Sequence, residues 1–122
     1  MIIQLKTQLH TLDGKPLTQP KQRVEEGIVV GQDEEDVILE NLIKGALLQG
    51  NEKDTADEKV EKFELTLRIS TAGDEIDLES EDIAMIKKLV GKIYAPLVVG
   101  QVFRLLEGKP TGLDGKKETS EV

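Results

Sequence analysis

The sequence predicts a mainly helical α+β domain: a compact bundle of about four helices, with one or two short N-terminal strands and a disordered C-terminal tail. Three observations predict this class. Apolar residues recur at helical spacing in four segments after residue 33. Residues 2–12 alternate in part between apolar and polar side chains. Residues 108–122 consist mainly of Gly, Lys, Thr, Ser and acids.

The chain divides into a single helical domain, residues 1–107, and a flexible tail, residues 108–122. Its 122 residues are enough to build one core without metal or disulfides. It has no cysteine, which fits a reducing compartment. The aromatic residues are only Phe63, Tyr94 and Phe103, so Leu, Ile and Val must form the core.

The N-terminal region predicts extended structure. Residues 2–12 favour a strand with one apolar face, which ends at the turn-forming pair Asp13 and Gly14. Pro20, Gly27 and Gly31 surround the short apolar run 28–30. This second segment, 16–33, predicts either another short strand or an extended linker.

The first helix is expected over residues 34–49. Asp33 is the candidate N-cap, and the acids at 34–36 would occupy the first turn, where the helix dipole favours them. One broad face is apolar, and Gly50 with Asn51 ends the helix. The residues of that face are Ile38, Leu39, Leu42, Ile43, Ala46 and Leu47.

Residues 56–70 fit two structures. The polar lead-in at 57–62 and the length favour a helix. The alternation of Phe63, Leu65, Leu67 and Ile69 with polar residues instead fits a strand, which would form a hairpin with the extended segment 75–79. The helix is preferred, and the strand stays open.

Two further helices follow. Glu79 or Ser80 would cap the first of them, with acids at 81 and 82 in its first turn and Gly91 as a break or a close-packing point. Pro96 stands at a helix-start position, and the last helix runs to Glu107.

The net charge of −8, from 24 acidic and 16 basic residues, restricts the partners. Nucleic acids and acidic lipid surfaces both require an excess of Lys and Arg, so neither is expected to bind directly. An acidic balance usually serves solubility. The alternative is a surface that mimics nucleic acid and occupies a basic cleft on another protein.

The residues also argue against catalysis. The chain has no cysteine and one histidine, His10, which we expect on the surface of the first strand. Neither a nucleophilic triad nor a zinc site can be assembled from this set. The acidic runs 33–36 and 74–82 lack the ligand spacing of a calcium loop, and no phosphate loop is present. We therefore expect no cofactor and no enzyme activity.

Three segments resemble one group of proteins. Residues 82–107, with the run Ile-Lys-Lys-Leu-Val-Gly-Lys-Ile-Tyr-Ala-Pro-Leu-Val-Val-Gly, are similar to the C-terminal part of small proteins of unassigned role encoded by tailed bacteriophages and prophages. Leu-Asp-Gly-Lys-Pro at 12–16 and Asn-Leu-Ile-Lys-Gly-Ala-Leu-Leu at 41–48 are similar to the same group. The resemblance covers about half of the chain and implies a phage setting, without functional residues to transfer.

Two binding functions follow from these expectations. The first is a modulator or inhibitor of a host protein, for anti-defence or host takeover, that uses the helix start at 33–36 and an acidic edge. The residues of that edge are Asp74, Glu75, Asp77, Glu79, Glu81 and Asp82. The alternative is a virion-assembly protein or assembly chaperone that binds a phage protein or forms a homo-oligomer. Its contact surface would lie on the last helix and include Tyr94, Val98 and Phe103.

An enzyme would need a site made of carboxylates alone, for which Asp77 and Glu79 are the candidates. The longest apolar runs are far shorter than the roughly 20 residues that span a bilayer. We therefore expect no membrane association and a location in the cytoplasm, which is the host cytoplasm for a phage protein.

Overall fold

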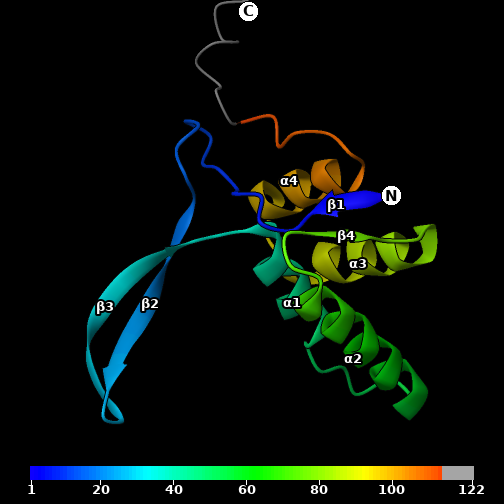
Figure 1. Cartoon of the computed structure of the whole chain (residues 1–122), viewed down its shortest axis with the longest axis horizontal. Coiled ribbons are helices and arrows are strands. Elements are labelled where there is room, and N and C mark those ends of the chain that lie inside the picture. The colour runs from blue at the N-terminus through cyan, green and yellow to red at the C-terminus, as the bar shows by residue number, and fades with distance from the viewer. Residues whose placement is uncertain (114–122) are drawn as a thin grey trace, which may run out of the picture.

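The computed structural model describes residues 1–113 as a helical body from which a two-stranded hairpin projects (Figure 1). In this part of the chain the elements are β1 (Ile2–Gln4), β2 (Thr18–Glu25), β3 (Ile28–Asp36), α1 (Leu39–Leu47), α2 (Ala56–Thr71), β4 (Glu75–Asp77), α3 (Ser80–Ile93) and α4 (Pro96–Leu106). The coarse prediction of an α+β fold with four helices and mostly N-terminal strands is confirmed. Residues 114–122 of the predicted tail lie outside the described residues.

The N-terminal strand is shorter than its alternation predicts. β1 pairs antiparallel with β4, with Ile3 opposite Ile76. After Gln4 the backbone leaves this sheet, so the strand predicted over 2–12 is corrected to Ile2–Gln4. Leu5 and Leu9 are still fully buried, because the irregular chain that follows bonds to other segments.

Three segments meet in a ring of backbone hydrogen bonds at the base of the hairpin. Leu17 N–H donates to Leu9 O, Leu9 N–H to Val37 O, and Val37 N–H to Leu17 O, each at 2.9 Å. The Gln8 side chain fills the centre of the ring, and its Nε2 lies 2.8, 3.0 and 3.1 Å from the carbonyl oxygens of Leu9, Leu17 and Val37. We call this arrangement the Gln8 junction.

β2 and β3 form a hairpin where a single short strand or linker was predicted. The turn has positive φ at both central residues, 52° at Glu26 and 78° at Gly27. This is the geometry of a type I′ turn, which matches the twist of paired strands and favours glycine at its second position. A bulge then places Val24 opposite Val29 and leaves Val30 unpaired.

The acidic run 33–36 lies in β3, so its prediction as the first turn of a helix is wrong. Basic and amide side chains of β2 face it across the ladder. Arg23 Nη1 lies 3.4 Å from Asp33, and Glu35 lies 3.7 Å from Lys21 Nζ. Opposite charges across an antiparallel pair stabilise the strand. The acids therefore have favourable partners in β3 without lying at a helix N-terminus.

α1 accordingly begins five residues later than predicted, at Leu39 rather than residue 34. Its N-cap is Ile38, whose side chain makes no capping bond, rather than Asp33. The predicted apolar face is otherwise confirmed in the core. Its buried residues are Leu39, Leu42, Ile43, Ala46 and Leu47.

α2 resolves the ambiguity over residues 56–70 in favour of the helix. Thr55 and Glu58 form a reciprocal capping box, in which Thr55 N donates to Glu58 Oε1 and Glu58 N donates to Thr55 Oγ1. Leu65 and Ile69 face the core, whereas Phe63 is exposed. The alternating apolar residues are thus divided between two faces of one helix.

The last two helices match their predictions closely. Glu79 is the N-cap of α3, and its backbone N–H donates to Asp82. Gly91 lies inside α3 and is therefore not a break. α4 begins at Pro96 and ends in a Schellman motif, in which Lys109 N bonds Arg104 O and Gly108 has a φ of 80°.

The first residues of the predicted tail contact the body. Thr111 is buried, and Pro110 O accepts a hydrogen bond from Arg104 Nε on α4. The core itself lies among β1, β4, α1, α3 and α4, with Leu65 and Ile69 of α2 at its edge. Val37 and Leu17, which flank the hairpin, contact this core, but β2 and β3 contribute no side chain to it.

The Gln8 junction yields a prediction about stability. Gln8→Ala removes a donor shared by three carbonyl oxygens, and we expect it to lower the free energy of unfolding by about 1–3 kcal/mol. Gln22→Ala, an exposed position on β2, should change it by less than about 0.5 kcal/mol. Urea denaturation measures both, and equal effects of the two substitutions would contradict the role of the junction.

Candidate functional site

The predicted acidic edge is occupied by intramolecular contacts. Asp77 Oδ1 accepts a hydrogen bond from the Met1 amino group at 2.7 Å, and Glu75 accepts one from Gln4 Nε2 at 2.8 Å. Both bonds tie β4 to β1, the strand beside it. The two carboxylates therefore hold the small sheet together.

The acids at the start of α3 also have local partners. Asp82 accepts from the Glu79 backbone at 3.2 Å and pairs with Arg68 of α2 at 3.5 Å. Glu81 accepts from the hydroxyl of Ser80, its neighbour in sequence. Asp74 contributes its backbone carbonyl to Leu5. Within residues 1–113, no three His, Asp or Glu side chains are grouped closely enough to hold a metal ion.

The residues predicted as a contact surface on the last helix pack against the core. Tyr94, Val98 and Phe103 are all partly buried there. The Tyr94 hydroxyl donates to Leu42 O at 2.8 Å, and burial raises the pKa of this phenol. Lys87 Nζ lies 5.3 Å from the centre of the Phe103 ring, so the ring is also covered by a cation.

His10 is half-buried rather than a surface residue, and its Nδ1 has no hydrogen-bond partner among the described residues. Its backbone is held by the buried Gln101 side chain. His10 N donates to Gln101 Oε1 at 2.8 Å, and Gln101 Nε2 donates to His10 O at 2.9 Å. This amide links the N-terminal loop to α4, which the composition alone did not indicate.

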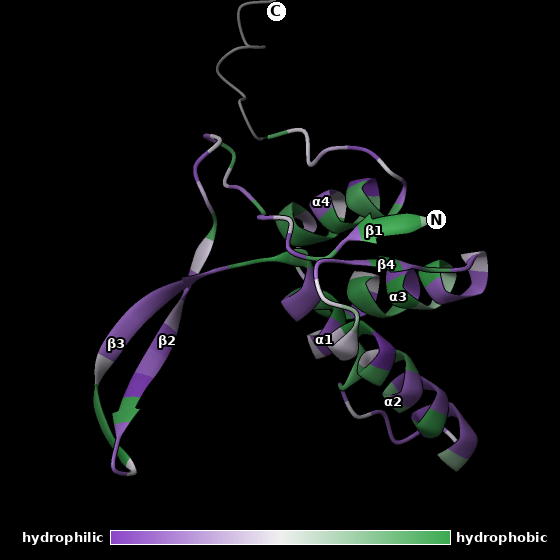
Figure 2. Cartoon of the chain, viewed as in Figure 1, coloured by the Kyte–Doolittle hydropathy of each residue, from purple (hydrophilic) through white to green (hydrophobic). Residues whose placement is uncertain are grey.

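The hairpin tip is an exposed apolar feature that was not predicted. We define it as Val24, Glu25, Glu26, Ile28, Val29 and Val30. Its four aliphatic side chains are between 46% and 66% exposed, and Figure 2 shows the hydrophobic end of the otherwise hydrophilic arm. Neither strand packs extensively against another element in the described part of the chain. The only signal in the sequence was the apolar run 28–30 next to Gly27.

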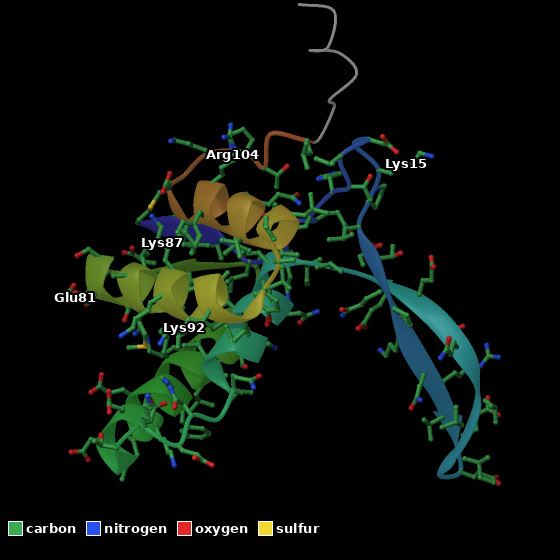
Figure 3. All side chains as sticks on the ribbon, turned by 180° about the vertical axis from the view of Figure 1, so that it is seen from behind. Lys15, Glu81, Lys87, Lys92 and Arg104 are labelled. Atoms are coloured by element: carbon green, nitrogen blue, oxygen red, sulfur yellow. The ribbon has the colours of Figure 1, made fainter. Side chains whose placement is uncertain are left out.

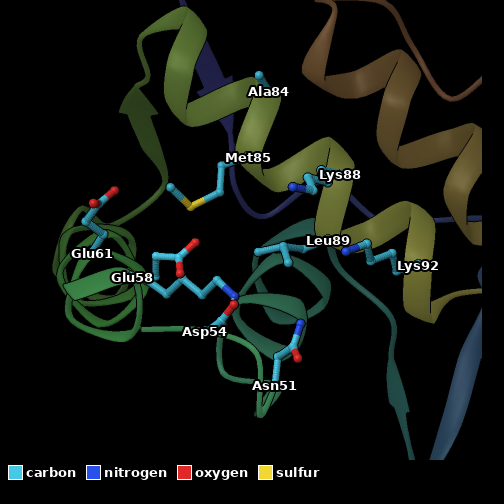
Figure 4. Close-up of a pocket in the computed structure, with 10 residues that line it drawn as sticks. Asn51, Asp54, Glu58, Glu61, Ala84, Met85, Lys88, Leu89 and Lys92 are labelled. Atoms are coloured by element: carbon cyan, nitrogen blue, oxygen red, sulfur yellow. The ribbon is translucent and has the colours of Figure 1, made fainter. Parts of the chain in front are cut away.

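A groove lies between α2 and α3 (Figure 4). Its volume is about 340 Å³, and Met85 and Leu89 form its apolar floor. Lys88 and Lys92 line the α3 side, and Glu58 and Glu61 line the α2 side. We call this the α2–α3 groove. The sequence did not predict it, because its residues come from two different helices and the loop before α2.

The outer face of α2 carries another apolar group. Val60, Phe63 and Leu67 are each about half exposed and follow one another at helical spacing. This outer stripe lies on the side of the helix opposite Leu65 and Ile69. None of these three residues lines the α2–α3 groove.

Glu40 is a buried carboxylate, only 5% exposed, at the start of α1. It pairs with Lys6 and, at 3.1 Å, with Lys44. Burial alone would raise the pKa of Glu40, but the hydrogen bonds from the two lysines outweigh it and hold the pKa below its usual range. The group is satisfied by two cations and stabilises the link between the N-terminal segment and α1.

Comparison of the chain with protein-family models, with curated proteins and with solved structures found no match. Among the helices of residues 1–113, none has both the length and the apolar character required to cross a membrane.

Glu40 predicts a dependence of stability on pH. Because its folded pKa is lowered, the stabilisation is complete above the ordinary pKa of about 4.3 and is lost as the pH falls through the folded value. We expect Glu40→Gln to cost about 1–3 kcal/mol at pH 7 and less near pH 3. Urea denaturation at both pH values checks this, with the exposed Glu64→Gln as the control. A cost independent of pH would contradict the assignment.

Tyr94 predicts a coupling with Gly45 of α1. A methyl group at Gly45 would lie 2.8 Å from the Tyr94 hydroxyl, which is held by Leu42 O. Gly45→Ala should therefore destabilise the protein despite the better helix propensity of alanine. In a Tyr94→Phe background the same change should stabilise it, by up to about 1 kcal/mol. A double-mutant cycle measures the difference, and additive effects would exclude the contact.

Proposed function

We propose that this chain is a non-enzymatic, phage-type protein that acts by binding other proteins, with the hairpin as its binding arm. The observation that carries the proposal is the exposed apolar tip on an arm whose strands pack extensively against no other element of residues 1–113. An isolated two-stranded hairpin is marginally stable in water. A contiguous apolar surface at such a position is typical of an interaction site.

The unpaired edges of the arm support the same proposal. Within the described residues 1–113, β2 and β3 pair only with each other, so each has one edge of backbone groups without a strand beside it. Pro20 lies in β2, and proline in a strand is tolerated where its missing N–H faces outward. The edge of β3 has no proline and can accept an added strand.

The non-enzymatic part of the proposal rests on the roles of the carboxylates. Asp77, one of the two candidates for a carboxylate site, binds the Met1 amino group. Glu79, the other candidate, is the N-cap of α3. The Asp77 side chain and the Glu79 backbone therefore make local structural contacts. The Gln101 amide bonds the backbone N–H and C=O of His10 and holds this residue against α4.

Of the two roles expected from the sequence, we favour virion assembly, including self-association. Head-to-tail assembly needs two different surfaces, and the chain has the hairpin tip and, separately, the α2–α3 groove. An inhibitor needs one surface. Modulation of a host protein remains the second candidate, because residues 18–36 contain six acids and two bases and would fit a basic cleft.

Site-specific photo-crosslinking tests the proposed function. A photoreactive amino acid at Val29 should give discrete protein adducts in phage-producing bacterial cells, whereas the same amino acid at Leu12 should give none. Leu12 is a suitable control because it is 66% exposed and lies outside the hairpin. Adducts with phage structural proteins or with the chain itself support assembly, and adducts with one host protein support modulation. Equal adducts from both positions would contradict the proposal that the hairpin is the binding arm.

A further inference from the structure

The hairpin tip combines an apolar surface with separated charges. Val24 lies opposite Val29, with Val30 displaced by the bulge, so three aliphatic side chains gather near the turn. Glu25 and Glu26 stand exposed at the turn itself. Arg23 lies on β2, on the side of the tip that is nearer the base of the hairpin. Arg23 is already paired with Asp33 of β3, so a surface that accepts this tip needs an apolar hollow and cations for the turn.

The α2–α3 groove has both properties, and its other side carries Glu58, Glu61 and the Lys62–Asp54 ion pair. Its floor is apolar, and the fold leaves Met85 and Leu89 only partly covered there. Lys88 and Lys92 are exposed on one wall, and Glu61 is exposed on the other. Within residues 1–113 neither of the two lysines forms an ion pair. They are therefore available to carboxylates that arrive with a partner.

The groove of the same molecule is out of reach for the tip. The Gln8 junction fixes the base of the hairpin to the body. From that base the arm extends away from α2 and α3 in the view of Figure 1 and also from behind, where Lys92 is labelled on α3 (Figure 3). The occupant must therefore come from another molecule.

Contacts between identical surfaces are less suitable. A tip against a tip would bring Glu25 and Glu26 of two molecules together, and like charges at a contact are unfavourable. A groove against a groove would leave both hollows unfilled. A tip in a groove joins the carboxylates of the turn to Lys88 and Lys92 and fills the hollow with aliphatic side chains.

We infer that the hairpin tip of one copy of this chain docks in the α2–α3 groove of a second copy. This inference rests on the proposed function and names the partner of its arm. The contact is heterologous, because different surfaces of the two copies meet. When two copies meet in this way, one tip and one groove of the pair remain unused. Further copies can bind there, so the contact generates a ring or an open chain rather than a closed dimer.

Light scattering after size-exclusion chromatography tests the inference on the full chain. The wild type should show a mass above the monomer that rises with concentration. Ile28→Asp, at the tip, and the double variant Lys88→Glu with Lys92→Glu, in the groove, should each weaken association by about thirtyfold or more. Leu12→Asp should associate like the wild type, since Leu12 has the same 66% exposure as Ile28.

Mixing the two defective proteins provides the decisive result. The tip variant keeps its groove and the groove variant keeps its tip, so an equimolar mixture should form a 1:1 dimer that neither forms alone. A single chain in which Lys88, Lys92, Glu25 and Glu26 are all reversed in charge should associate again. Circular dichroism melting confirms that each variant is folded.

Several results would overturn the inference. A monomeric wild type at millimolar concentration, equal association of the wild type and the variants, or a mixture that stays monomeric each excludes the tip-in-groove contact. The proposed function has a separate readout. Crosslinks from Val29 to another phage protein, together with a monomeric chain, would leave the proposed function intact while the self-contact fails.

Discussion

The Gln8 junction is the constraint on which the rest of the structure depends. Leu9, Leu17 and Val37 come from three segments, and their backbone groups satisfy one another in a closed ring. Buried backbone groups without partners are costly, so these three segments are held side by side at the ring. Residues before Leu17 and after Val37 therefore belong to the body. The residues between them form the projecting hairpin, whose strands contribute no side chain to the core (Figure 1).

The parts of the fold that the sequence predicts are those with strong local patterns. The helical spacing and caps of α3 and α4 identify them within a few residues, and the length and lead-in of α2 favour the correct state. The acidic run 33–36 misleads because acids suit a helix start equally well. In the structure this run pairs along its backbone with β2, and Lys21 and Arg23 of β2 add exposed ion pairs. Pairing with a distant strand is invisible to a local pattern.

The candidate site shows the same limit. Exposed carboxylates are easy to find, but the partners of Asp77 and Asp82 come from the chain terminus and from α2. Tyr94 is likewise satisfied by a carbonyl oxygen on α1. Residues that stand out in the sequence are thus used to hold the fold. The hairpin tip and the α2–α3 groove depend on tertiary arrangement, and their apolar residues resemble ordinary core positions until the core is complete.

The separation of core and arm allows stability and binding to vary independently. The core contains no side chain from the tip, so the tip can be apolar without any contribution to folding. Exposed aliphatic groups promote indiscriminate association, and a net charge of −8 opposes it. Association then requires a surface that offsets this repulsion locally. In the proposed contact, two exposed lysines beside an apolar hollow supply that offset, so the groove would favour an arm that is both aliphatic and acidic.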